Sequence, residues 1–236
     1  MSDNKISTGS FDFNDFLNGG YEKDIITMIA GPPGSGKTNL AILTACSSAN
    51  KGGKVIFIDT EGGFSVERVK QIIGDNYEKV LEKILILNPT TFDEQRDCFQ
   101  KLLKNLKKEQ IDLIVIDGMA MLYRLELADE DKIKEVNFEV ANQMRDLSEI
   151  SRKQKIPIII TNQVYSQFIK GEYSEEEKIV NIIGGDLFQY WSKCIIELKK
   201  NGDSRKAVLL KHRSLPIKEM SFEIRDKGIF KKKLWI

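Results

Sequence analysis

Cysteine is scarce in this chain, and its spacing excludes two classes of small protein. The 236 residues contain three cysteines, Cys46, Cys98 and Cys194. An odd number at such wide spacing fits neither a paired disulfide framework nor a four-ligand zinc site. We therefore predict that all three are small core residues of a protein in a reducing cytoplasm.

Long apolar runs, low-complexity stretches and internal repeats are also missing. No run approaches the roughly 20 apolar residues of a membrane helix, and the start, MSDNKISTGSFDF, lacks the basic-then-apolar pattern of a signal peptide. The 41% apolar content excludes disorder and collagen, and the length suffices to bury a core without disulfides. We expect one cytoplasmic domain over 1–236, without membrane contact.

Net charge is close to zero, yet the two signs are unevenly spread. The sequence has 36 Lys and Arg against 35 Asp and Glu. Residues 193–236 hold 13 of these basic residues against 5 acidic ones, so the last part is strongly basic and the rest is acidic. The basic part is either a surface that meets nucleic-acid phosphates or a solvated face.

Apolar strand patterns alternate with helical patterns up to residue 162. The strand patterns lie at 25–31, 54–60, 84–87, 112–117 and 157–162. The helical patterns lie at 37–50, 65–73, 92–108 and from Ile133 to Leu147. Solid apolar strands separated by helices predict an α/β fold with a mostly parallel twisted sheet and helices on both faces.

The rhythm changes at residue 193. Three strand-like stretches follow with no helix between them, separated by Asn201-Gly202-Asp203 and Leu215-Pro216. Asn-Gly is a strong hairpin signal, so 193–236 is predicted to be a basic extension of antiparallel strands on one edge of the sheet.

The strongest motif is a complete G-x-x-x-x-G-K-T sequence between a predicted strand and a predicted helix. It consists of Gly31, Pro32, Pro33, Gly34, Ser35, Gly36, Lys37 and Thr38. Such a loop wraps phosphate oxygens with backbone N–H groups, while its lysine adds a positive charge and its threonine hydroxyl binds Mg²⁺. The alternative, a glycine turn with a chance lysine, fits the structural setting less well.

Polar residues at three other strand ends complete the predicted nucleotide site. Asp117 ends LIVID, where a carboxylate reaches Mg²⁺, although such an aspartate also caps turns. Glu61, in IDTEGG, is placed to polarise a water, or is a turn residue. Asn162 and Gln163 are amides that can sense a γ-phosphate, or are structural.

With these strand ends identified, the chain resembles the RecA/RadA recombinase superfamily, and most closely its archaeal RadB group. The resemblance rests on TGSFDFNDFLNGGYEKDIITMIAGPPGSGKT, IDTEGGFSVERV, LIVIDG, TNQV and GGDLFQYWSKCIIELKK, in that order over nearly the whole chain. It implies a RecA-like P-loop NTPase core that binds ATP and Mg²⁺ through Lys37, Thr38 and Asp117, with Glu61 as catalytic glutamate and Gln163 reporting the γ-phosphate.

The resemblance also implies roles for residues that physical chemistry alone leaves unassigned. Arg68 occupies the position that stacks on adenine, although by itself it is typical of a solvated helix residue. Lys211, His212 and Arg213 resemble a basic element that contacts DNA in RadB proteins and reaches a neighbour's γ-phosphate in related hexameric ATPases. A lone histidine such as His212 is otherwise usually a surface or core residue.

The chain also departs from full recombinases. These carry a helical N-terminal DNA-binding domain and a linker aromatic that docks on the next subunit, whereas only a short segment, 1–24, precedes the first core strand here. We therefore expect no separate DNA-binding domain and no filament by the usual route. Phe11 and Phe13 are core or staple aromatics, or one of them docks on a partner.

Two regions are candidates for DNA contact. The segment after Gln163 takes the place of the family's central DNA loop, but its acidic residues oppose phosphate binding, leaving Tyr165, Phe168 and Tyr173 to stack on bases or to pin a surface loop. The alternative is the late basic cluster, which comprises Lys199, Lys200, Arg205, Lys206, Lys211, His212, Arg213 and Lys231 to Lys233.

The expected function is an ATP- and DNA-binding accessory protein of homologous recombination and DNA repair. It would be a weak ATPase, not itself a strand-exchange recombinase, acting as a monomer or small oligomer on single-stranded or branched DNA, with a recombinase or junction nuclease as partner. Two rivals stay open: a self-assembling ATPase like the circadian-clock KaiC group, with Lys211 and Arg213 as fingers in trans, and a nucleotide switch that meets only proteins.

Overall fold

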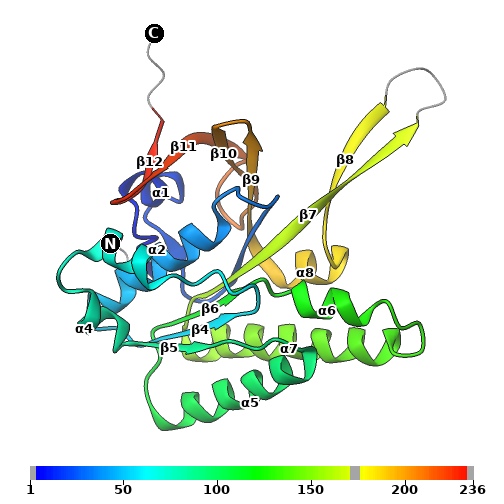
Figure 1. The fold of residues 1–236 in the computed structure, drawn as a ribbon, viewed down its shortest axis with the longest axis horizontal. Helices are drawn as coiled ribbons and strands as arrows, with labels where there is room; N and C mark the ends of the chain where they lie inside the picture. The colour runs from blue at the N-terminus through cyan, green and yellow to red at the C-terminus, as the bar shows by residue number, and fades with distance from the viewer. Residues whose placement is uncertain (1–3, 171–175, 233–236) are drawn as a thin grey trace.

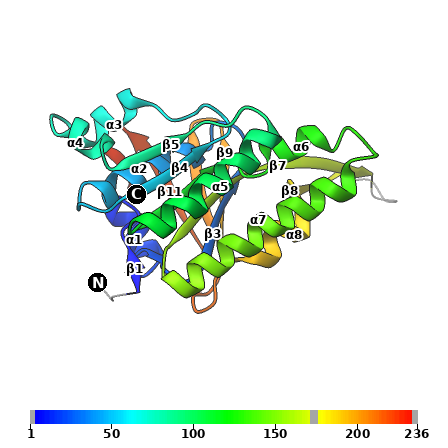
Figure 2. The same ribbon diagram turned by 90° about the horizontal axis from the view of Figure 1, so that it is seen from below.

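A large mixed sheet separates two layers of helices (Figure 1 and Figure 2). The computed structural model describes residues 4–170 and 176–232, and for 166–170 and 176–182 it describes the backbone alone. Within these ranges the sheet has ten strands: β3 (Ile26–Gly31), β4 (Val55–Asp59), β5 (Ile84–Leu87), β6 (Leu113–Asp117), β7 (Ile158–Lys170), β8 (Glu176–Ile182), β9 (Ser192–Asn201), β10 (Ser204–Lys211), β11 (Lys218–Arg225) and β12 (Gly228–Lys231).

The strand order is β12-β11-β10-β9-β3-β7-β6-β4-β5, and β8 pairs with β7 outside this path. The six strands from β9 to β5 run parallel to one another. Their carboxyl ends therefore meet at one edge of the sheet, which we call the carboxyl edge, and their beginnings form the amino edge. The predicted α/β fold with a mostly parallel sheet is confirmed.

The basic last part differs from the prediction in one respect. Its first strand, β9, is parallel to β3, and only β10, β11 and β12 are antiparallel to their neighbours. Because β10 runs from the carboxyl edge to the amino edge, Arg205 and Lys211 near its two ends lie on opposite sides of the molecule. The late basic cluster is thus two separate groups.

The segment after Gln163 also differs from the predicted loop. β7 continues to Lys170 and pairs antiparallel with β8, from Val164 opposite Ile182 to Lys170 opposite Glu176. The two strands form an arm that projects from the body in Figure 1. The apolar run ends at the body, so hydrophobicity gave no signal for the rest of the strand. The side chain of Phe168 and the whole of Tyr173 lie outside the described residues.

Eight helices are present in the described ranges. They are α1 (Phe11–Phe16), α2 (Lys37–Ala49), α3 (Val66–Ile73), α4 (Tyr77–Leu81), α5 (Phe92–Lys108), α6 (Met121–Glu126), α7 (Ile133–Gln154) and α8 (Gly185–Trp191). Helices α1 to α4 pack on one face in a core that includes Leu40 and Phe57, and α5 to α8 pack on the other with Phe99 and Met144. None of these helices is both long and apolar enough to cross a membrane.

The N-terminal segment packs against the end of the chain. Ser10 caps α1 and donates from Oγ to the Ile229 carbonyl at 2.6 Å, and Phe13 is fully buried edge-to-face against Phe222. Phe11, by contrast, is 85% exposed. A two-residue pairing of β1 (Lys5–Ile6) with β2 (Tyr21–Glu22) fixes the start of this segment. The three cysteines are free and buried, as predicted.

Candidate nucleotide site

The predicted phosphate loop connects β3 to α2 at the carboxyl edge. β3 ends at Gly31, and α2 begins at Lys37 after Gly36, whose φ of 108° is left-handed. This left-handed φ favours glycine, because an L side chain would be strained there. A Cβ would in addition displace the tip of the Ile224 side chain, whose Cδ1 would lie 2.8 Å away. The turn directs the free N–H groups of the α2 N-terminus at the space above the loop, which suits an anion.

Lys37 turns back over the loop that precedes it. Its side chain donates to the carbonyls of Gly31 at 2.9 Å and Pro32 at 3.2 Å, and the residue is only 6% exposed. Burial lowers the pKa of the Lys37 ammonium, and the negative charges of Glu61 and Asp117 act in the opposite direction. An ammonium held by neutral carbonyls beside a helix N-terminus is well suited to a phosphate group.

Thr38 and Asp117 meet although 79 residues separate them. Thr38 Oγ1 donates to Asp117 Oδ2 at 2.7 Å, and Thr161 Oγ1 donates to Asp117 Oδ1 at 2.5 Å. Asp117 is fully buried, and burial raises its pKa, against the lowering effect of the two hydroxyls. Hydroxyl and carboxylate oxygens are the ligands that Mg²⁺ prefers, so Thr38 and Asp117 fit the predicted metal role.

Asp59 organises the loop that carries Glu61, a role that the sequence did not reveal. Its carboxylate accepts three backbone hydrogen bonds, from Glu61 at 3.2 Å, Gly63 at 3.1 Å and Phe64 at 2.8 Å, and the residue is 3% exposed. Thr60 adds hydrogen bonds to the carbonyls of Asp117 and Gly118. The ends of β4 and β6 are therefore held together directly beneath Glu61.

Glu61 and Gln163 are brought together, as their predicted roles require. Gln163 Nε2 donates to Glu61 Oε1 at 3.2 Å. Both line a small pocket of about 10 Å³, with Gly118 and Arg124 on its other sides. That volume is close to the smallest that holds one water molecule. A carboxylate and an amide facing such a pocket can orient a water for attack on a phosphate.

Asn162 links this pair to the projecting arm. Its side chain is 1% exposed, donates to the Ile183 carbonyl at 2.7 Å and accepts from the Gln163 N–H at 2.9 Å. The Ile183 N–H in turn donates to the Gln163 carbonyl. Gln163 thus lies at the base of the β7–β8 arm. Tyr165, two residues further along β7, is 42% exposed.

Arg68 is tied to the far end of the chain. Its guanidinium donates to the carbonyls of Arg225 and Asp226, at 3.0 Å each, and to the Gln71 side chain at 2.9 Å. Burial lowers its pKa. Arg68 is therefore a positioned residue that joins α3 to the β11–β12 turn, not a free solvated one. This arrangement leaves its adenine-stacking role as a prediction.

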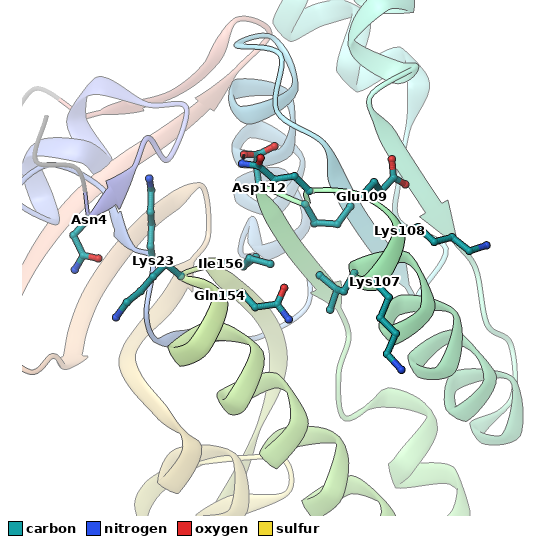
Figure 3. A pocket seen from close by; sticks show the side chains of 12 residues that line it. Asn4, Lys23, Lys107, Lys108, Glu109, Asp112, Gln154 and Ile156 are labelled. Carbon is teal, nitrogen blue, oxygen red and sulfur yellow. Dashed lines mark hydrogen bonds between the residues drawn. The ribbon is translucent and has the colours of Figure 1, made fainter.

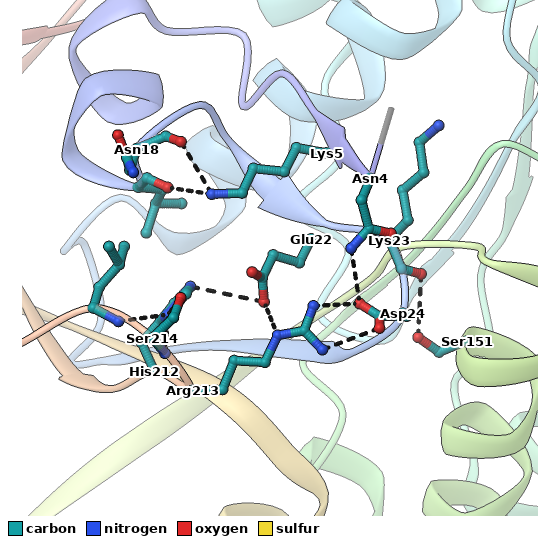
Figure 4. Close-up of polar contacts among 12 residues, drawn as sticks. Asn4, Lys5, Asn18, Glu22, Lys23, Asp24, Ser151, His212, Arg213 and Ser214 are labelled. Carbon is teal, nitrogen blue, oxygen red and sulfur yellow. Dashed lines mark hydrogen bonds and ion pairs between the residues drawn. The ribbon is translucent and has the colours of Figure 1, made fainter. Parts of the chain in front are cut away.

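Lys211, His212 and Arg213 lie at the amino edge, at the opposite end of the strands from the phosphate loop. Figure 4 shows His212 and Arg213 beside Glu22 and Asp24. Arg213 donates to both carboxylate oxygens of Asp24, at 2.7 and 3.0 Å, and its Nε lies 2.7 Å from Glu22. The guanidinium of Arg213 holds the pKa of Asp24 below its usual value.

His212 is turned inward from the same strand end. Its side chain is 2% exposed, and Nδ1 accepts hydrogen bonds from the backbone of Ser214 and Leu215. Burial lowers the pKa of His212. The imidazole thus stabilises the local turn, and its direct contact with DNA stays a prediction. Lys211 donates to the Gln189 carbonyl at 2.7 Å.

Two large hollows lie at the amino edge. One, of about 740 Å³, is lined by residues that include Lys23, Lys107, Lys108 and Asp112 (Figure 3). The other, of about 1030 Å³, lies between α7, α8 and the start of β3. We call the second hollow the basic groove; its charged and aromatic lining consists of Arg145, Arg152, Lys153, Lys155, Lys193, Arg213, Asp24, Glu149, Tyr190 and Trp191.

Comparison with known proteins gives one consistent result. The profile of the Rad51 family matches residues 3–232. A DNA repair and recombination protein RadB of Methanobrevibacter smithii is 38% identical, with 95% of each chain covered. The protein of the same name from Methanocaldococcus jannaschii is 43% identical, with 91% of this chain and 97% of the relative covered. In Methanosphaera stadtmanae the corresponding protein is 42% identical over 90% of each chain.

Proposed function

The chain belongs to the Rad51 family, within it to the RadB group, and from that premise we propose that it is an ATP- and DNA-binding accessory protein of homologous recombination and DNA repair. Its relatives are named as DNA repair and recombination proteins. Proteins of this family generally bind ATP with Mg²⁺, and the residues at the carboxyl edge suit that ligand.

The observation that carries the nucleotide part is the hydrogen bond between Thr38 and Asp117 beside the Lys37 ammonium. Lys37 and the loop amides would hold the phosphates, and Thr38 with Asp117 would hold Mg²⁺, which neutralises charge on the phosphate oxygens when bound. Glu61 would act as the general base that receives a proton from water, with Gln163 orienting it.

We further propose that hydrolysis is slow. In related ATPases a cation from a neighbour accelerates the reaction by roughly 10³–10⁵. Lys211 and Arg213 lie at the edge opposite to their own phosphate loop, so they could serve only a neighbouring subunit. Arg213 would also have to leave Asp24 and Glu22 to do so.

The basic groove is the surface that best supports DNA binding. Six cationic side chains line it against the carboxylates of Asp24 and Glu149. Tyr190 is 68% exposed at its margin, where an aromatic ring can stack on an unpaired base. We therefore propose sequence-independent binding of single-stranded or branched DNA in the groove, with Arg213 as part of its lining.

The nucleotide proposal is tested by Lys37→Ala. This variant should lose most of its affinity for Mg·ATP, measured by calorimetry, because a charge-assisted contact to phosphate is worth about 1.5–3 kcal/mol. Its circular dichroism should match that of the wild type. Unaltered affinity would show that the loop does not hold the phosphates.

The DNA proposal is tested by Arg152→Glu in the groove, with Lys79→Glu on α4 as a control of the same charge change on the other face. Loss of one phosphate contact should lower the slope of log K against log salt by about 0.7 for a single strand. Equal DNA affinities of the two variants at low salt would exclude the groove as the DNA surface.

The oligomeric state decides between this function and its rival. We expect a monomer or small oligomer, with weak ATP turnover, when mass and turnover are measured on one sample with and without ATP and DNA. A discrete ring that turns over ATP rapidly would instead favour the self-assembling ATPase. A recombinase and a junction nuclease are the partners to test for altered activity in its presence.

A further inference from the structure

The turn between β9 and β10 places a lysine directly beside the phosphate loop. β9 is parallel to β3, so its last residues emerge at the carboxyl edge next to the loop. The Nζ atom of Lys200 lies 3.2 Å from the position that a Cβ on Gly34 would occupy. Lys200 is therefore a cation of the basic last part whose side chain reaches the phosphate loop.

Arg205 stands opposite Lys200 on the neighbouring strand. The register of β10 pairs Arg205 with Lys200, so their side chains share one face of the sheet. Two like charges directly opposite each other are destabilising. Within residues 4–170 and 176–232 neither side chain has an ion pair, and the buried Nε of Arg205 has no hydrogen-bond acceptor. This pair lacks an anion.

The adjacent cationic pair on the other face is different. Lys199 and Lys206 are also register partners, but Lys199 lies 3.4 Å from Glu197 and Lys206 lies 2.8 Å from Glu219. The protein thus supplies carboxylates to the pair that faces away from the phosphate loop. The pair that shares the face of the loop is left without them.

We propose that Lys200, supported by Arg205, is a second phosphate contact of the nucleotide site, supplied by the same chain that carries the loop. Its ligand is the phosphate chain of a nucleoside triphosphate, whose negative charge would relieve the repulsion between the two cations. This inference rests on the proposed nucleotide function. It explains how one chain can hold a triphosphate without a cation from a neighbour.

The test uses Lys200→Ala, with Lys199→Ala as the matched control on the same strand and opposite face. Affinity for Mg·ATP and for inorganic tripolyphosphate is measured by calorimetry on the full chain, with Lys37→Ala alongside. Lys200→Ala should weaken both ligands about tenfold, the loss of one charge-assisted hydrogen bond. Lys199→Ala should bind both as the wild type does. Tripolyphosphate isolates the phosphate chain from contacts to the base.

Thermal unfolding provides a second measurement, in which Lys200→Ala should affect the melting temperature differently with and without ligand. Without ligand, Lys200→Ala should melt no lower than the wild type, because one of two repelling charges is gone. With Mg·ATP, its rise in melting temperature should be smaller. If Lys37→Ala loses binding while Lys200→Ala and Lys199→Ala bind equally well, this inference is wrong and the nucleotide function stands. If the wild type binds neither ligand, both proposals fall.

Discussion

Asp59 offers a prediction in which structure sets the magnitude. Its Oδ1 accepts from the N–H groups of Glu61 and Gly63, and its Oδ2 accepts from that of Phe64. In Asp59→Asn the amide oxygen can keep the two bonds at Oδ1. The amide nitrogen then faces the Phe64 N–H, so two donors meet and one bond to a charged acceptor is lost. We expect a loss of about 2 kcal/mol in the free energy of unfolding.

Urea unfolding measures this loss, and thermal unfolding provides a second value. For a chain of this size about 2 kcal/mol corresponds to a fall of roughly 4–8 °C in melting temperature. ATP turnover should fall as well, since the loop that carries Glu61 is loosened. Asp203→Asn, in the exposed β9–β10 turn, is the control and should change neither. An Asp59→Asn variant within about 0.5 kcal/mol of the wild type would refute the loop-organising role of Asp59.

Three further predictions concern packing and pH. Phe13→Ala should lower the free energy of unfolding by about 3–5 kcal/mol in urea, whereas Phe11→Ala should change it by less than about 0.5 kcal/mol; equal losses would contradict the burial difference. Burial raises the pKa of Asp117, so the affinity for Mg²⁺ in the presence of ATP should weaken as pH falls through that raised value. The free energy of unfolding of the ligand-free protein should gain from Asp117 over the same fall in pH. An affinity for Mg²⁺ that does not change with pH would contradict this. The pKa of Asp24 is lowered, so its pairing with Arg213 stabilises the fold at pH values above the ordinary aspartate pKa. This stabilisation is lost as pH falls through the lowered pKa of Asp24. In Arg213→Ala, the free energy of unfolding should not show this fall in acid.

The candidate site was largely predictable because parallel strands bring their carboxyl ends together. Polar residues that follow different buried strands therefore lie close together. On this ground the sequence alone placed five residues at one edge of the sheet: Lys37, Thr38, Asp117, Glu61 and Gln163. The role of Asp59 was missed because the residue pattern does not show which backbone N–H groups a carboxylate accepts from. Its one signal was a charged residue ending a buried strand, the signal that identified Asp117.

The contacts that involve the last strands were beyond prediction. The pairing of Arg213 with Glu22 and Asp24, and that of Arg68 with the carbonyls of Arg225 and Asp226, depend on how the last strands are placed on the sheet. The sequence predicted antiparallel strands there but contains no periodicity that shows β9 beside β3. From the sequence alone, the basic residues of the last part were therefore predicted to form a single cluster.

The course of β10 limits how this protein can be dissected by deletion. Removing the chain after residue 192 would take away the neighbour of the phosphate loop at one end and Arg213, a wall of the groove between α7 and α8, at the other. Loss of ATP binding and loss of DNA binding would then appear together in such a truncation, even if the two activities are independent. Single substitutions, one at each end of β10, can show whether ATP binding and DNA binding are coupled or independent.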